Sequence, residues 1–78
     1  DIAGAWIRYD QYGKRTPYGW EVSYIRPLSK GGNRDFGNLQ LLHWRNNKYK
    51  GEDYPVCRTC VSSDGNMNIE KIRIWQIE

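Results

Sequence analysis

Few side chains in this sequence could take part in catalysis or hold a metal ion. His43, the only histidine, lies four residues before Asn47, so the two side chains would share one face of a helix. Cys57 and Cys60 form a C-x-x-C pair, which is half of a four-ligand zinc site. A single histidine makes that site hard to complete, and no βαβ unit is apparent that would place the pair at a redox turn. We therefore expect two reduced thiols or a local disulfide on a strand, and the compartment stays undetermined.

Basic residues are concentrated in the middle of the chain. Between positions 26 and 50, six basic residues accompany one acidic residue, Asp35, which gives this segment a charge of +5 in a chain of net charge +3. Concentrated positive charge favours a polyanion partner, because each neutralised phosphate releases counterions. An ordinary solvated basic face is the alternative. The candidate nucleic-acid-binding residues are Arg26, Lys30, Arg34, Arg45, Lys48 and Lys50.

The elements that position these side chains follow from periodicity and turn residues. Alternating apolar and aromatic residues predict short strands over residues 5–9, 19–25 and 38–42. Glycine, asparagine and aspartate between them predict a structured loop over residues 29–37. The segment that follows the last of these strands predicts about two turns of helix over residues 43–50.

The C-terminal part of the chain has a different pattern. Residues 56–62 are β-prone, and the Asp64-Gly65 step is a hairpin turn signal. The isoleucine-rich segment 67–77 would supply the second strand of that hairpin. Its alternation slips between Ile69 and Ile72, which predicts a bulge or a strand with two apolar faces.

The length of the chain allows a single domain of class α+β. A chain of 78 residues buries a small core, and here aromatic residues, 14% of the sequence, must supply much of it. No apolar run is long enough to cross a membrane, and no signal peptide is visible. Because the chain begins at Asp1 rather than at methionine, we expect an excised domain or a processed product.

Residues 18–32 and 38–51 resemble the two halves of an HNH endonuclease motif. The matching elements are Pro27, Gly31-Gly32, Asn38-Leu39 and the Asn-x-x-Lys-Gly stretch that ends at Gly51, in this order and spacing. The resemblance covers residues 4–55. It implies a small ββα-metal (His-Me finger) core there. Together with the flanking strands and the C-terminal β-hairpin, which the sequence pattern predicts over residues 56–78, this core would form a single domain.

The resemblance also implies roles for individual residues. In active members an Asp-His or His-His pair on the first strand supplies a metal ligand and the general base that activates water. Asn38 matches the asparagine that braces the long loop, and Asn47 matches the metal ligand on the helix. His43 would be either a further ligand or a packing element. The implied cofactor is one divalent metal (Mg, Mn, Ni or Zn), bound weakly or not at all.

The catalytic pair departs from the family pattern at both positions. Ser23 stands where the metal ligand belongs, and a neutral hydroxyl is a poor ligand for a hard divalent ion. Tyr24 stands at the position of the base; tyrosine ordinarily has a pKa of about 10, against about 6.5 for histidine. A general base works best with a pKa near the operating pH. Alternatively, the Tyr24 ring fills the core beside Trp20 and Val22.

Three functions are compatible with this sequence. The first is an HNH-nuclease-like domain that has lost catalysis and binds DNA or RNA, or serves as a structural subunit of a larger assembly. The second is an active metal-dependent endonuclease with a non-standard base. The third is a protein-interaction scaffold, because Trp6, Trp44 and Trp75 are a large aromatic load for so small a core and exposed aromatic residues often anchor partners.

Overall fold

Two β-hairpins and one short helix make up the fold. The computed structural model describes residues 1–76 of the chain. Within that range the chain forms one α-helix and four strands, so the expected α+β class is confirmed at the level of a small mixed fold. The elements are β1 (Trp20–Tyr24), β2 (Leu39–His43), α1 (Trp44–Lys50), β3 (Val56–Asp64) and β4 (Met67–Gln76), with 3-10 turns at Tyr9–Gln11, Leu28–Lys30 and Phe36–Asn38.

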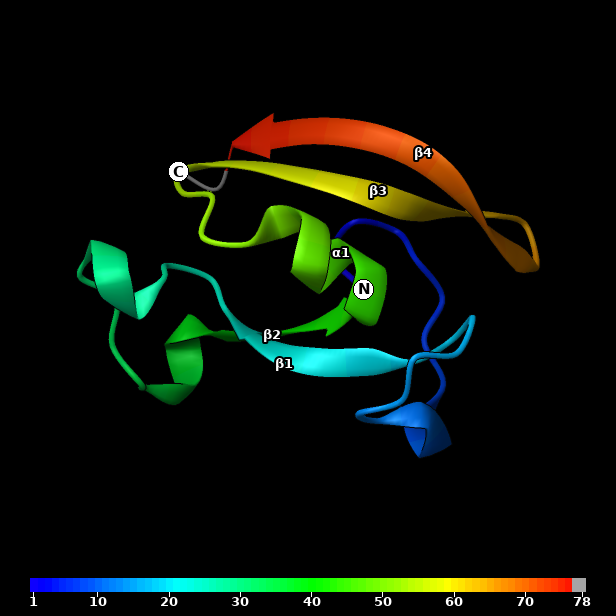
Figure 1. Ribbon diagram of the computed structural model, residues 1–78, viewed down its shortest axis with the longest axis horizontal. Coiled ribbons are helices and arrows are strands. Elements are labelled where there is room, and N and C mark those ends of the chain that lie inside the picture. Colours follow the sequence, from blue (N-terminus) through cyan, green and yellow to red (C-terminus); the bar gives the residue numbers. More distant parts are fainter. Residues whose placement is uncertain (77–78) are drawn as a thin grey trace.

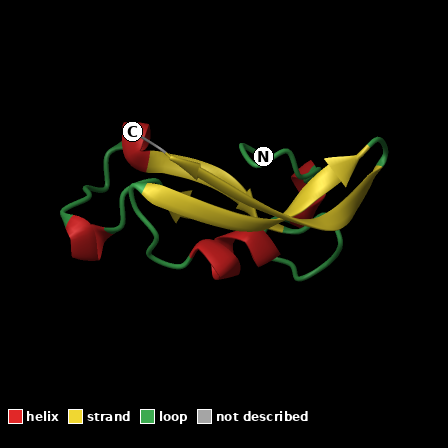
Figure 2. Ribbon diagram, turned by 90° about the horizontal axis from the view of Figure 1, so that it is seen from above, coloured by secondary structure: helices red, strands yellow, loops and turns green. Residues whose placement is uncertain are grey.

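Helix α1 lies between the two hairpins (Figure 1). Strands β1 and β2 pair antiparallel, from Trp20 opposite His43 to Tyr24 opposite Leu39. Strands β3 and β4 form a second, longer antiparallel pair that twists along its length (Figure 2). The order strand, strand, helix over residues 20–50 agrees with the elements expected from the sequence.

The face of β1 that points into the molecule is not the one expected. Ser23 is buried, as is Leu42 on the neighbouring strand, whereas Val22 is exposed. Because side chains alternate along a strand, Glu21 and Ser23 share the inner face. The expectation that Tyr24 fills the core together with Val22 is therefore wrong, and the Tyr24 residue is half-buried beside its cross-strand partner.

The N-terminal segment is extended but forms no strand, in contrast to the strand expected over residues 5–9. The side chain of Asn68 takes the place of a strand partner: its Oδ1 accepts from Trp6 N at 2.7 Å and its Nδ2 donates to Trp6 O at 2.8 Å. The Asp1 carboxylate accepts from the backbone N–H groups of Ala3 and Ala5, and both alanines are buried. Side-chain amide and carboxylate groups thus supply the hydrogen-bond partners of the backbone here. A strand pattern in the sequence does not reveal such partners.

The C-terminal hairpin forms with its turn at Gly65, whose φ of +69° suits glycine. The pairing register shifts between Thr59 and Val61, which lie opposite Arg73 and Glu70, so two residues of β4 face one residue of β3. The bulge expected from the slipped isoleucine pattern is therefore confirmed. Across residues 1–76, no helix has the length and apolar character needed to cross a membrane.

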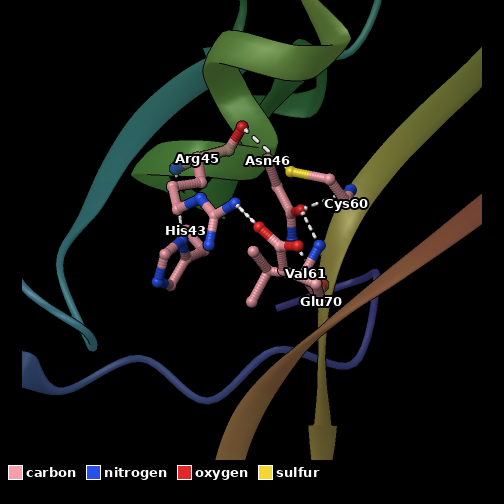
Figure 3. Close-up of polar contacts among 6 residues, drawn as sticks. All are labelled: His43, Arg45, Asn46, Cys60, Val61 and Glu70. Carbon is pink, nitrogen blue, oxygen red and sulfur yellow. Dashed lines mark hydrogen bonds and ion pairs between the residues drawn. The ribbon is translucent and has the colours of Figure 1, made fainter.

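Asn46 joins α1 to β3 (Figure 3). Its side chain is fully buried. Oδ1 accepts from the backbone N–H groups of Cys60 at 2.9 Å and Val61 at 2.7 Å, and Nδ2 donates to Val61 O at 2.9 Å and to the Asp1 carboxylate at 3.2 Å. The amide thus pairs with β3 as a neighbouring strand would.

We expect the Asn46→Ala variant to be less stable by about 2–4 kcal/mol, since buried backbone groups left unpaired cost about 1–3 kcal/mol each. For a domain of this size the midpoint of thermal unfolding should fall by roughly 10–30 °C, measured by circular dichroism. Lys48→Ala, at an exposed position of the same helix, is the control and should change stability by less than about 0.5 kcal/mol. Equal midpoints for the two variants would contradict the role given to Asn46.

Candidate functional site

A cleft of about 320 Å³ lies between the end of β1 and the C-terminal end of α1. It brings together three of the residues singled out from the sequence, Ser23, Tyr24 and Asn47. Its full lining comprises Val22, Ser23, Tyr24, Pro27, Leu28, Asn47, Gly51 and Glu52. The helix ends here because Gly51 has a φ of +53°, which side-chain-bearing residues rarely adopt.

Asn47 reaches from α1 toward β1, where its Nδ2 donates to Glu21 Oε2 at 3.4 Å. Glu21 lies two residues before Ser23 and therefore on the same face of the strand. Sequence reasoning missed Glu21, because the apolar residues Trp20, Val22 and Tyr24 indicated the opposite face of β1 as the inner one. Ser23 itself is buried, and its hydroxyl makes only a long contact of 3.5 Å with the carbonyl of Tyr24.

Lys50 lies beneath the cleft and not on the surface. Its side chain is only 1% exposed, and Nζ donates to Tyr24 O at 3.3 Å. Burial lowers the pKa of this amine, because removal from water disfavours its charged form. The expectation that Lys50 contacts nucleic acid is therefore not supported: the side chain ties the end of α1 to β1.

His43 closes the start of α1 as its N-cap. Nδ1 accepts from Arg45 N at 3.1 Å, and Nε2 lies 2.8 Å from Pro17 O. Since Nδ1 accepts, the proton belongs on Nε2, which donates to the carbonyl. Burial lowers the pKa of His43, which favours this neutral ring. The ring stacks on Trp44 at 5.9 Å between centroids.

These contacts give His43 a role different from that of Asn47. The prediction that the two side chains share one helix face requires both residues to lie inside the helix. His43, however, precedes the first residue of α1. Both ring nitrogens have protein partners, so the ring offers no free lone pair to a metal ion. The contacts agree with the packing role and do not favour the ligand role.

The donor atoms of the cleft do not fit a resident divalent cation. HNH domains commonly use a divalent metal, and Mg²⁺ and Ca²⁺ take several oxygen ligands, usually including carboxylates. Ser23 offers a neutral hydroxyl and Asn47 an amide, while Glu52 is the one carboxylate in the lining. Over residues 1–76, no three histidine, cysteine, aspartate or glutamate side chains are grouped so that they could hold a metal ion.

The two cysteines lie on β3 as free thiols. Burial raises the pKa of both Cys57 and Cys60, so the protonated thiols are favoured over thiolate ligands. The sequence left open either two reduced thiols or a local disulfide, and the structure has two reduced thiols on β3.

Asn38 holds the long loop in place. Its Oδ1 accepts from Arg26 N at 2.9 Å, and its Nδ2 donates to Arg26 O at 3.0 Å and to Asn33 O at 2.7 Å. The loop also folds tightly onto its own start, since a Cβ at Gly32 would lie 1.9 Å from Arg26 O. We call residues 26–38 the braced loop.

The six candidate nucleic-acid-binding residues fall into two groups. Four are exposed, three of them on the braced loop and one on α1: Arg26, Lys30, Arg34 and Lys48. The Arg26 guanidinium donates to Lys30 O at 2.7 Å and stacks on the Tyr54 ring at 5.3 Å, which fixes its position. Lys50 is buried, and Arg45 pairs with Glu70 across to β4 (Figure 3).

The family model for HNH endonucleases matches residues 10–53, more than half of the 78 residues, and the match includes β1, the braced loop, β2 and α1. No curated protein and no solved structure matches the chain. The chain belongs to the HNH endonuclease family.

Proposed function

We propose that this HNH domain binds nucleic acid without cleaving it. Membership of the family supports a nuclease-like or nucleic-acid-related function. The observation that carries the proposal is the contrast between the cleft and the loop beside it. The cleft contains Ser23 and Tyr24, which the sequence resemblance aligns with the family's catalytic pair, while the braced loop has exposed cations.

The cleft is poorly suited to activating water. Tyr24 supplies no imidazole at the position of the base, and losing general-base catalysis typically removes a factor of about 10²–10⁴ in rate. The loss at Ser23 adds to this, because the position that should carry a carboxylate or imidazole ligand carries a buried hydroxyl. The nearest carboxylate that an inward residue of β1 provides, Glu21, already contacts the Asn47 amide.

The braced loop is well suited to contacting phosphates. Arg26, Lys30 and Arg34 lie on a segment that the Asn38 side chain holds in one conformation. Cations on a fixed segment lose less conformational freedom on binding than cations on a mobile one. Such contacts position the nucleic acid but do not read its sequence.

We expect binding to a DNA duplex to weaken with salt, and to weaken less steeply in a Lys30→Ala, Arg34→Ala variant. Each lost phosphate contact should reduce the slope of log affinity against log salt by about 0.9, so the two together remove roughly 2. Fluorescence anisotropy between about 50 and 200 mM salt measures the slope. Lys71→Ala, exposed on β4 of the other hairpin, is the single-charge control and should leave the slope unchanged. Wild-type affinity that is independent of salt would rule out phosphate contacts.

We expect no nicking of supercoiled plasmid by the wild-type domain in Mg²⁺, Mn²⁺ or Ni²⁺ above a chelated sample. The reason is that position 23 lacks a metal ligand and position 24 lacks a histidine base. The Ser23→Asp, Tyr24→His variant restores a carboxylate and an imidazole on β1 next to Asn47, and we expect it to nick. Metal-dependent nicking by the wild type would establish the alternative, an active endonuclease with a non-standard base.

One observation favours a protein contact as a second candidate function. Strand β4 presents Ile72 and Ile74 to solvent on the C-terminal hairpin, outside the segment that matches the family. Exposed apolar side chains of this kind can serve as an interaction site. Sedimentation of the wild type beside an Ile72→Lys, Ile74→Lys variant tests for association between copies of the chain, and two identical monomeric profiles would count against that form of contact.

A further inference from the structure

The braced loop carries an aromatic side chain at a position where it has no part in the core. Phe36 is 91% exposed and begins the 3-10 turn Phe36–Asn38. The turn is fixed at its end, because Asn38 N donates to Asp35 O at 2.9 Å and the Asn38 side chain holds Arg26 and Asn33. The ring is therefore presented to solvent by a segment that is itself held in place.

The braced loop that carries Phe36 has a net positive charge. The braced loop has Arg26, Lys30 and Arg34 against Asp35 as its one acidic residue, a net charge of +2 over 13 positions. The loop extends beyond the ends of β1 and β2, at one end of the molecule (Figure 1). A single exposed apolar residue needs no explanation by itself. An exposed ring on a braced loop of net positive charge, by contrast, has the two elements of a surface that binds single strands: positive charge along the backbone and a stacking platform for a base.

We propose that Phe36 stacks on an unpaired base of a single-stranded DNA or RNA segment, while the cations of the braced loop contact the neighbouring phosphates. The inference rests on the proposed nucleic-acid binding and names its substrate class. Every base has a π-face, so a phenyl ring without hydrogen-bonding groups would give affinity with little sequence preference.

An unpaired base fits this ring better than a duplex. The faces of bases in a duplex are covered by their neighbours, and inserting a side chain requires a base step to be unstacked. One exposed ring would have to offset that loss alone. A single strand exposes its base faces without this loss, so the same ring gains the stacking interaction directly.

The chain contains a matched control for Phe36. Tyr9 is 95% exposed and also begins a 3-10 turn, Tyr9–Gln11. Tyr9 lies outside the braced loop, and its neighbours Arg8 and Asp10 are close enough to form an ion pair, at 3.9 Å. A general effect of removing an exposed aromatic ring would appear at both positions, whereas stacking within the cationic loop would appear at Phe36 alone.

The test compares an unstructured single-stranded oligonucleotide with a duplex of the same length, by fluorescence anisotropy with the whole domain. We expect Phe36→Ala to weaken single-strand binding by about 5- to 100-fold and duplex binding by less than about twofold. The salt slope should stay as in the wild type, because the ring neutralises no phosphate. Phe36→Trp should retain or increase affinity, Phe36→Leu should lose most of it, and Tyr9→Ala should match the wild type.

The outcomes separate this inference from the proposed function. Wild-type binding to single strands that Phe36→Ala leaves unchanged would overturn the stacking role and leave nucleic-acid binding intact. Equal losses on single strand and duplex, or full affinity in Phe36→Leu, would also overturn it, since neither depends on an unpaired base and a π-face. No wild-type binding to either nucleic acid would overturn both proposals. Circular dichroism melting of each variant should match the wild type, as expected for an exposed side chain.

Discussion

The buried amide of Asn46 is the interaction on which the remaining structure depends. Two-stranded hairpins are marginally stable alone in water, and a helix of seven residues is far below the length that is stable by itself. None of the three units of this fold can therefore stand without the others. Asn46 connects α1 to β3 through the backbone of Cys60 and Val61, and Lys50 connects the other end of α1 to β1 through Tyr24 O. The distance between β1 and α1, which defines the cleft, follows from these connections.

Polar side chains that looked available for chemistry are used to hold the chain together. His43 caps the helix, Arg45 pairs with Glu70, and Lys50 is buried against a carbonyl. A small chain with few aliphatic residues has little apolar surface to bury, so directed polar contacts must supply part of its order. A binding partner would therefore contact the side chains that these interactions do not use, above all those of the braced loop.

The order of elements over residues 20–50 could be predicted from the sequence, because alternation, glycines and the family motif all indicate the same boundaries. The inner face of β1 could not, because Trp20, Val22 and Tyr24 look apolar, whereas the packing of α1 turns Ser23 inward. His43 and Asn47 are four residues apart, a spacing that predicts a shared helix face. They do not share one, because a cap residue points differently from a residue inside the helix. The expected strand at residues 5–9 does not form, and the side chain of Asn68 pairs with the Trp6 backbone instead. No local sequence pattern connects these two residues.

The burial of Ser23 gives a physical reason for the departure from the family pattern. A carboxylate at this inner position of β1 would be ionised and largely removed from water, which is unfavourable unless a metal ion or another cation compensates it. A metal would offset that penalty in an active enzyme, so a site of this kind trades stability for function. If the domain does not cleave nucleic acid, as we propose, a neutral hydroxyl avoids the penalty and is compatible with β1, α1 and Asn47 as they stand. Under the proposed loss of catalysis, a serine at position 23 is thus compatible with retention of the family fold.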